Sequence, residues 1–377
     1  MTDGRATHTL IIAGFVAAVC CVGVTQVTLE LSRGDRPQFT ELFSQAPTKA
    51  NLMAFEKDLE DNCWLAQRLR PWVQYALFVV MQDAGDKAIL GRNGWLFYRP
   101  AVRYLTERWP ADATPTTKEI VSAIVSFRDQ LDARGIKLLL VPVPNKVSVY
   151  PEMLRSRADV QTKCVNARTL ELMARLKQTG VEIVDLFEIY RQARLSSDQT
   201  RLYLAQDSHW SPQGAQLAAQ AVAGRILDLG WIKKGTIQYD LTPVVVRRHG
   251  DILRMMQVPQ IEQLFMPEEI ECLQVVERTS GKPYHDDPNS QVLVLGDSFL
   301  RIYERDEPGS AGFIAHLARE LGLGVTSIVN DGGASTLVRQ ELGRKPQLLA
   351  NKKVVVWEFV ERDIRFGTEG WQIMPLP

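Results

Sequence analysis

Two short stretches of this chain carry residue types that could support nucleophilic catalysis. The first, Asp207-Ser-His-Trp-Ser-Pro-Gln-Gly214, places a carboxylate two residues before an imidazole. The second, Leu295-Gly-Asp-Ser-Phe299, presents a hydroxyl directly after an apolar run. Because serine is a weak nucleophile at neutral pH, it needs a base, and the base needs an acidic group to orient it. These residue types predict Ser298 as nucleophile, His209 as general base and then acid, and Asp207 as the orienting group.

Each stretch also has a purely structural interpretation. Gly-Asp-Ser is a common turn sequence, and Ser211 followed by Pro212 is a typical helix start. In that interpretation His209 is a surface histidine on a capping loop. The two stretches strengthen each other, because the chain order Asp, His, Ser is one of several that convergent triads use.

Acyl transfer also requires hydrogen-bond donors for the oxyanion that forms during the reaction. The backbone N–H of Ser298 is the first candidate. The turn Asn330-Asp-Gly-Gly333 follows another apolar run. We therefore expect Asn330, Gly332 or Gly333 to supply the second donor, although an ordinary turn would have the same composition.

Three further residues are candidates for substrate binding. Lys146 could meet an anionic substrate, and a structural salt bridge is its alternative role. Trp210 and Tyr98 could stack on sugar rings, whereas most aromatic side chains belong to a core or an interface.

The elements that must position these residues alternate between helix and strand. Amphipathic stretches at 117–134 and 170–178, and a helix over 215–229, separate short apolar runs that we interpret as strands. Such alternation predicts an α/β fold with a parallel central sheet, at whose carboxyl edge ligands bind. Residues 234–290 break the rhythm with Pro243, Pro259 and Pro267 and are predicted to be an insertion at a sheet end. The predicted strands are 136–143, 181–184, 291–295, 325–329 and 354–360.

The N-terminus contains an apolar segment of membrane-spanning length. Leu10 to Val27 carries no charge, and 9–29 reaches the roughly 20 residues that a bilayer requires. We predict an uncleaved signal anchor over 1–34, with the single domain 35–377 outside the cytoplasm. A cleaved signal peptide is the alternative, although no clear cleavage site follows the apolar run.

The charge balance and the cysteine spacing argue against nucleic-acid binding and against a zinc site. Lys+Arg and Asp+Glu both number 44, so the net charge of +0 offers no bulk attraction for nucleic acid. No cysteine pair has the spacing of a zinc site, and neither a metal nor a cofactor is expected. In an oxidising compartment we expect one disulfide among Cys63, Cys164 and Cys272, with the pairing left open.

Several motifs in a consistent order resemble one known family, the SGNH-hydrolase-like domain of the alginate O-acetyltransferases of the AlgJ/AlgX type. The resemblance covers most of the chain beyond the anchor. It rests on the two stretches above and on four others, Gly91-Arg-Asn-Gly-Trp-Leu-Phe-Tyr98, Val143-Pro-Asn-Lys-Val-Ser-Val-Tyr-Pro151, Gly250-Asp-Ile-Leu-Arg-Met255 and Trp357-Glu-Phe-Val-Glu-Arg362.

This resemblance implies a three-layer SGNH fold and a periplasmic enzyme held at the bacterial inner membrane. The enzyme would move acetyl groups onto hydroxyls of an exported, alginate-like polysaccharide, with Asp207, His209 and Ser298 as the triad. It further implies a multi-pass membrane O-acyltransferase that supplies the acetyl groups. Two alternatives stay open from the sequence: a polysaccharide acetylesterase with the same triad, and a non-catalytic polysaccharide-binding scaffold subunit.

Overall fold

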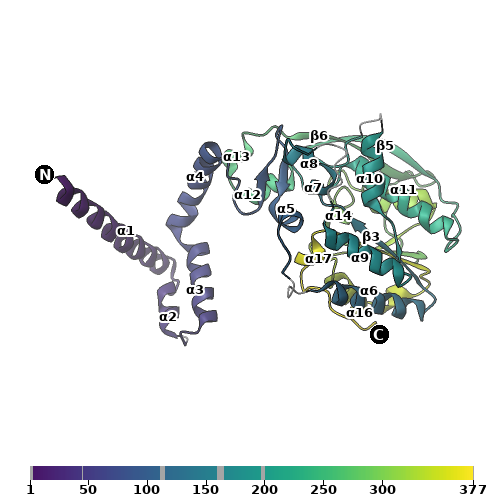
Figure 1. The fold of residues 1–377 in the computed structure, drawn as a ribbon, viewed down its shortest axis with the longest axis horizontal. Coiled ribbons are helices and arrows are strands. Elements are labelled where there is room, and N and C mark those ends of the chain that lie inside the picture. The colour runs from purple at the N-terminus through teal and green to yellow at the C-terminus, as the bar shows by residue number, and fades with distance from the viewer. Residues whose placement is uncertain (1–2, 45, 111–114, 159–164, 197–199, 377) are drawn as a thin grey trace. The chain divides into compact units, whose positions relative to one another are not determined.

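The structure, a computed structural model, describes residues 3–44, 46–110, 115–158, 165–196 and 200–376, and its contacts divide the chain into two units (Figure 1). The first unit comprises Met1–Gln82 with Val258–Gln260, and the second comprises Asp83–Gln257 with Ile261–Pro377. The predicted boundary between an anchor over 1–34 and a domain over 35–377 stays a prediction. The division by contacts is a different one, since it groups residues up to Gln82 together.

Helices make up the first unit. Its first helix, α1, contains the stretch Ile12–Arg33, which is long and apolar enough to cross a membrane. The last helix, α4, carries Pro71 inside it and has no buried side chain. The elements of this unit are α1 (Asp3–Arg33), η1 (Gln38–Thr40), α2 (Glu41–Ser44), α3 (Lys49–Asn62) and α4 (Trp64–Met81).

A five-stranded parallel sheet forms the centre of the second unit. Its spatial order is β4-β3-β9-β7-β8, so β9, the last strand in sequence, lies between β3 and β7. Each strand lies in one of the five predicted apolar runs, or within one residue of it. The strands are β3 (Lys137–Val143), β4 (Glu182–Ile183), β7 (Val292–Gly296), β8 (Thr326–Val329) and β9 (Val354–Val360).

Helices cover both faces of this sheet, which makes the three-layer α/β architecture that the sequence predicted. Alternate residues of a strand face opposite sides. In β7, Val292 and Val294 pack in one core with α11 and α15, whereas Leu293 and Leu295 pack in a second core with α6, α9 and α16. These helices are α6 (Thr117–Asp132), α9 (Ala167–Gln178), α11 (Pro212–Asp228), α15 (Phe313–Leu321) and α16 (Leu337–Arg344).

Residues 234–290 contribute a two-stranded antiparallel sheet that is separate from the central one. Its strands β5 (Tyr239–Arg248) and β6 (Glu268–Glu277) pair along their whole length, and α12 (Asp251–Met256) and α13 (Pro259–Glu262) occur between them in sequence. Whether this segment is an insertion stays a prediction.

The remaining elements are β1 (Ala88–Leu90), β2 (Leu96–Tyr98), α5 (Arg99–Thr106), α7 (Lys146–Val149), α8 (Pro151–Leu154), α10 (Leu186–Leu195), α14 (Ser298–Arg301), η2 (Pro346–Leu349) and α17 (Asp363–Phe366).

The cysteines bear on the expected disulfide. Cys63 and Cys272 are both recorded as free thiols, and they belong to different units, so the expected disulfide stays a prediction. Cys164 lies outside the described residues.

Candidate active site

Ser298 lies at the carboxyl edge of the central sheet, two residues after the end of β7, where it begins the short helix α14. Asp297 caps this helix by accepting a hydrogen bond from the N–H of Phe299 at 2.8 Å. Gly296 is needed here for space rather than for a positive φ. A Cβ at this position would lie 2.3 Å from Oε2 of Glu358 and 2.5 Å from Cδ1 of Leu300.

The loop before α11 presents the carboxylate and the imidazole. Ser211 caps α11 by accepting a hydrogen bond from the N–H of Gly214 at 3.0 Å, and Pro212 occupies the first helical turn, as predicted. Upstream of this cap the loop folds back on itself. Oδ1 of Asp207 accepts hydrogen bonds from the backbone N–H of His209 at 3.0 Å and from its Nδ1 at 2.7 Å.

The structure brings all three predicted triad residues together. Nε2 of His209 lies 2.8 Å from Oγ of Ser298, although the two residues are 89 positions apart in sequence. An ionised carboxylate can only accept hydrogen bonds, so Nδ1 carries the ring proton and Nε2 accepts from the serine hydroxyl. In this arrangement the imidazole can take the hydroxyl proton without moving.

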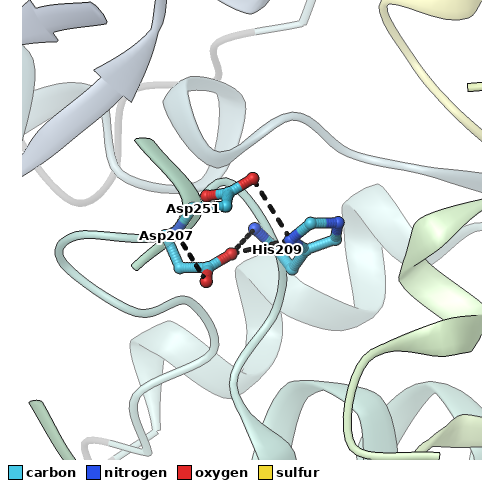
Figure 2. Close-up of side chains that lie close together, drawn as sticks. All are labelled: Asp207, His209 and Asp251. Carbon is cyan, nitrogen blue, oxygen red and sulfur yellow. Dashed lines mark hydrogen bonds and ion pairs between the residues drawn. The ribbon is translucent and has the colours of Figure 1, made fainter. Parts of the chain in front are cut away.

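A second carboxylate, Asp251 at the start of α12, also lies against this imidazole (Figure 2). Its Oδ2 is 3.5 Å from Nδ1 of His209, and its backbone N–H donates to Oδ2 of Asp207 at 3.1 Å. The backbone N–H and the hydroxyl of Ser208 donate to the Asp251 carboxylate at 2.6 and 2.5 Å. Sequence reasoning assigned no role to Asp251; its place in the stretch 250–255, which carries part of the family resemblance, was the available signal.

The close approach of these two loops depends on Gly250. A Cβ there would lie 2.1 Å from the carbonyl carbon and oxygen of Gln206. No other residue type allows the backbone before α12 to come this near to the Asp207 loop.

Burial and charge set the protonation of the group. Burial alone would raise the pKa of Asp207, but the charge and hydrogen bond of His209 and the guanidinium of Arg248 hold it well below its usual range. Burial and the charge of Asp207 raise the pKa of Asp251 to about 6. Burial favours neutral His209, yet the two carboxylates outweigh burial and raise its pKa. Asp207 therefore stays ionised, and His209 is well suited to take up a proton.

Asp207, His209 and Asp251 also place metal-binding atom types within 4.8 Å of one another. Most of these atoms already have hydrogen-bond partners. Nδ1 of His209 is a donor, both oxygens of Asp251 accept from Ser208, and Arg248 lies 3.6 Å from Oδ2 of Asp207. A cation at this point would displace a donor from each carboxylate and compete with a guanidinium. The residues fit a charge network around an imidazole better than a metal centre.

The oxyanion-hole candidates separate into two groups. As the first residue of α14, Ser298 has an N–H with no acceptor within the helix. The N–H of Asn330 instead donates to the carbonyl of Gly296 at 3.0 Å, and that of Gly333 donates to the carbonyl of Asn330 at 2.9 Å. The turn after β8 thus uses the backbone donors of Asn330 and Gly333 for its own structure. Ser298 and Gly332 remain as backbone candidates.

Lys146, a candidate for substrate binding, has its ammonium group inside the protein rather than at the surface. It is buried, and its Nζ donates to the backbone carbonyls of Leu96, Ala205 and Asp207 at 2.5, 2.7 and 2.9 Å. Burial lowers its pKa to about 7. Its role is to hold the Asp207 loop against β2.

The two aromatic candidates also differ in position. Trp210 is completely buried, with its ring stacked on Phe313 at 5.7 Å and edge-on to Phe299 at 5.2 Å, so it is a core residue and cannot stack on a sugar. Tyr98 is only half-buried and lies 5.2 Å beneath the guanidinium of Arg362. Of the three substrate-binding candidates, Tyr98 alone keeps a surface that a ligand could reach.

Comparison with known proteins agrees with this geometry. The family model of the SGNH hydrolase-like domain of acetyltransferase AlgX matches residues 88–361, which is well over half of the chain. The chain is 25% identical over 324 residues to the probable alginate O-acetylase AlgJ of Pseudomonas fluorescens, covering 83% of this chain and 75% of the relative. It is also 25% identical over 331 residues to the Pseudomonas aeruginosa protein of the same name, covering 83% and 77%.

The fold has a counterpart among solved structures. The O-acetyltransferase domain of Pseudomonas putida AlgJ superposes with a TM-score of 0.59 at 24% identity, covering 74% of this chain and 92% of that domain. The family suggested by the sequence motifs is thereby confirmed. This chain is a member of the AlgX-type family of SGNH hydrolase-like O-acetyltransferases.

Proposed function

We propose that this chain transfers acetyl groups onto hydroxyls of an exported polysaccharide through an acetyl ester on Ser298. The observation that carries the proposal is the unbroken hydrogen-bond chain from Asp207 to Nδ1 of His209 at 2.7 Å and from Nε2 to Oγ of Ser298 at 2.8 Å. A buried imidazole between an ionised carboxylate and a hydroxyl is the arrangement that activates serine.

In the first half of the reaction, Oγ of Ser298 attacks the acetyl carbonyl of the donor while Nε2 of His209 takes the hydroxyl proton. The carbonyl oxygen becomes an oxyanion, which the N–H of Ser298 stabilises in this proposal. The bond to the leaving group then breaks, and the leaving group takes the proton from His209. Acetyl-Ser298 and a neutral imidazole remain.

In the second half a sugar hydroxyl replaces the leaving group. His209 takes its proton, the sugar oxygen attacks the acetyl ester, and Oγ of Ser298 leaves with the proton returned by the imidazole. Asp207 stabilises the imidazolium that forms in each half, because its carboxylate stays ionised beside Nδ1. A site that excludes water until the sugar binds favours transfer over hydrolysis.

The nature of the acceptor rests on the relatives. Two of them are named probable alginate O-acetylase, which supports alginate or a similar polyuronate as the acceptor of this chain. Alginate consists of uronic acids, so each sugar ring of such an acceptor carries a carboxylate.

We further propose that α1 is an uncleaved anchor in the bacterial inner membrane and that the second unit lies in the periplasm. The length and apolar composition of Ile12–Arg33 support this placement. An acetyl group from the cytoplasm would then have to cross the membrane, and we propose a multi-pass membrane O-acyltransferase as its supplier. Protease added to spheroplasts should degrade the second unit. In a separate sample without protease, the protein should stay in the membrane fraction after alkaline extraction.

The acyl-enzyme can be tested with the full-length chain in detergent. A fluorophosphonate probe should label the peptide that contains Ser298, and an aryl acetate should acetylate the same serine. The exposed Ser280 offers a matched control, because its hydroxyl donates to Glu277 and contacts no triad residue, and its replacement by alanine removes an equivalent group. We expect labelling in wild type and Ser280→Ala and none in Ser298→Ala.

Adding an oligouronate to the same reaction separates the three candidate functions. Acetylated oligouronate, detected by mass spectrometry, supports the acetyltransferase. Release of acetate alone supports the esterase. If no peptide is labelled and no acetate is released, the scaffold interpretation replaces both.

A further inference from the structure

Arg362 is a cation at the edge of the candidate active site that the acyl-transfer steps do not use. It follows β9 after one residue, Glu361, whose buried carboxylate accepts hydrogen bonds from Asn145, Ser148 and Thr169. Because Glu361 is fixed inward, the chain turns and leaves Arg362 half-buried. Its guanidinium carbon lies 5.2 Å from the ring of Tyr98 and 5.7 Å from the ring of Phe299.

These contacts place Arg362 close to the reacting groups. Phe299 is the residue after Ser298, and its ring lies 4.8 Å from the ring of His209. The charge of Arg362 is also felt at His209, where it opposes the rise in pKa that the two carboxylates cause. Arg362 and His209 therefore lie against the same aromatic ring, that of Phe299.

The guanidinium of Arg362 has neither an ion pair nor a hydrogen-bond partner within the described residues. Two arginines nearby in sequence or at the same sheet edge are paired: Arg301 with Asp306 at 2.5 Å and Asp331 at 2.9 Å, and Arg365 with Glu107 at 3.2 Å. Two flanking aromatic rings hold the group in place without using any of its five donors.

Nearby acids do not neutralise this cation. Burial raises the pKa of Asp297 and Glu358, and it raises that of Asp363 to about 8. None of the three has an oxygen within 4.0 Å of Arg362, since no such ion pair forms in the described part of the chain. The fixed fork of N–H donors is therefore free to bind a planar anion, and a carboxylate matches it with two parallel hydrogen bonds.

We propose that Arg362 binds the carboxylate of a uronic acid in the acceptor and so orients a sugar hydroxyl toward the acetyl ester on Ser298. The inference rests on the proposed acetyl transfer to a polyuronate. Tyr98 supports the guanidinium from below and lies where a sugar ring bound to Arg362 could contact it. The residue would thus select acidic over neutral polysaccharides.

The test compares two acceptors with the full-length chain and a neutral aryl acetate as donor. One acceptor is an oligouronate, and the other is the same oligosaccharide with its carboxylates reduced to alcohols. In wild type we expect kcat/KM to favour the oligouronate. In Arg362→Gln this preference should fall roughly 10- to 100-fold, mainly through KM, because a charge-assisted pair is lost. Arg362→Lys, which keeps the charge but not the fork, should lose less.

Arg365→Gln is the matched control, because it removes an arginine three residues away that already has a carboxylate partner, and it should keep the wild-type preference. Equal loss on both acceptors in Arg362→Gln would instead assign Arg362 a structural role. A last comparison replaces the neutral aryl acetate by acetyl phosphate as donor. If Arg362→Gln loses activity only with this anionic donor, and does so with both acceptors, then Arg362 binds the donor and the proposal is wrong.

Two results keep this inference separate from the proposed function. If wild type acetylates neither acceptor, the acetyl transfer itself is refuted. If wild type acetylates both equally well, transfer stands and the role of Arg362 does not. Should Arg362→Gln fail to fold, the test uses the preference of the wild-type enzyme for the oligouronate over the reduced acceptor. Added salt should reduce this preference, because it screens a charge pair. A preference that salt leaves unchanged contradicts the proposal.

Discussion

The loop that carries His209 and the turn that carries Ser298 are stabilised in different ways. The Asp207 loop is held by polar groups from distant segments: Lys146 bonds its carbonyls, and Glu268 accepts from the N–H groups of Ala205 and Gln206 at 2.9 and 2.7 Å. The Ser298 turn has bonds of this kind at two points: the N–H of Asp297 donates to Glu358 at 3.1 Å, and the carbonyl of Gly296 accepts from the N–H of Asn330 at 3.0 Å.

The difference reflects what each part must do. The imidazole cycles through a charged state, so its surroundings need fixed charges and donors that do not reorganise. The hydroxyl needs only a fixed position. The end of a buried strand supplies it, together with the close packing of the Gly296 backbone against the side chains of Glu358 and Leu300. The base is thus controlled mainly by electrostatics and the nucleophile mainly by sterics, and four substitutions test this division.

The largest effect is expected from Ser298→Ala. Removing the nucleophile should lower kcat by roughly three or more orders of magnitude. The small side chain makes few contacts, so thermal unfolding should stay close to wild type. Turnover of an aryl acetate measures the first quantity, and a loss below about tenfold would rule out Ser298 as the nucleophile.

Asp207→Asn tests the electrostatic part. An amide keeps the shape but cannot stabilise an imidazolium, and it can hold the wrong tautomer, so kcat should fall roughly 10³- to 10⁴-fold. Circular dichroism should show an unchanged fold. Near-normal turnover would mean that Asp251, and not Asp207, is the main partner of His209.

Gly296→Ala tests the steric part. Its Cβ would meet Oε2 of Glu358 at 2.3 Å. This carboxylate is buried and accepts from the N–H of Asp297, so we expect its displacement to shift the turn that carries Ser298. A displacement near 1 Å costs roughly 100-fold in kcat. Gly224→Ala in α11 is the control, because nothing lies within 4 Å of its Cβ, and activity should be unaffected. Equal activity of the two variants would contradict steric control of the nucleophile.

Asp251→Asn should have the smallest effect, about tenfold. His209 must be neutral to act as a base, and its pKa lies above the ordinary value because burial is outweighed by Asp207 and Asp251, with Arg362 opposing them. Activity should therefore rise with pH through this raised pKa. Without the Asp251 charge, the acid limb of the kcat/KM profile should move to lower pH. An unmoved limb would show that Asp251 does not influence His209.

The central elements and the triad residues could be predicted because their signals are local. A continuous apolar run such as 354–360 indicates a strand covered on both faces, and Ser211-Pro212 specifies a helix start by its own chemistry. The roles of Lys146 and Trp210 could not be predicted, since a lysine or a tryptophan has the same sequence signal whether it binds a ligand or fills a core. Only burial distinguishes the two.

By itself the sequence determined which residues could form a nucleophile, a base and an orienting acid, because that depends on side-chain chemistry and short spacing. It also indicated the five strands of the central sheet in their order along the chain. Tertiary structure alone decided that Asp251 joins His209 and that Arg362 has no ion pair among the described residues. Both depend on how segments far apart in sequence meet at one edge of the sheet, and such distances are set by packing of the whole unit rather than by any local pattern.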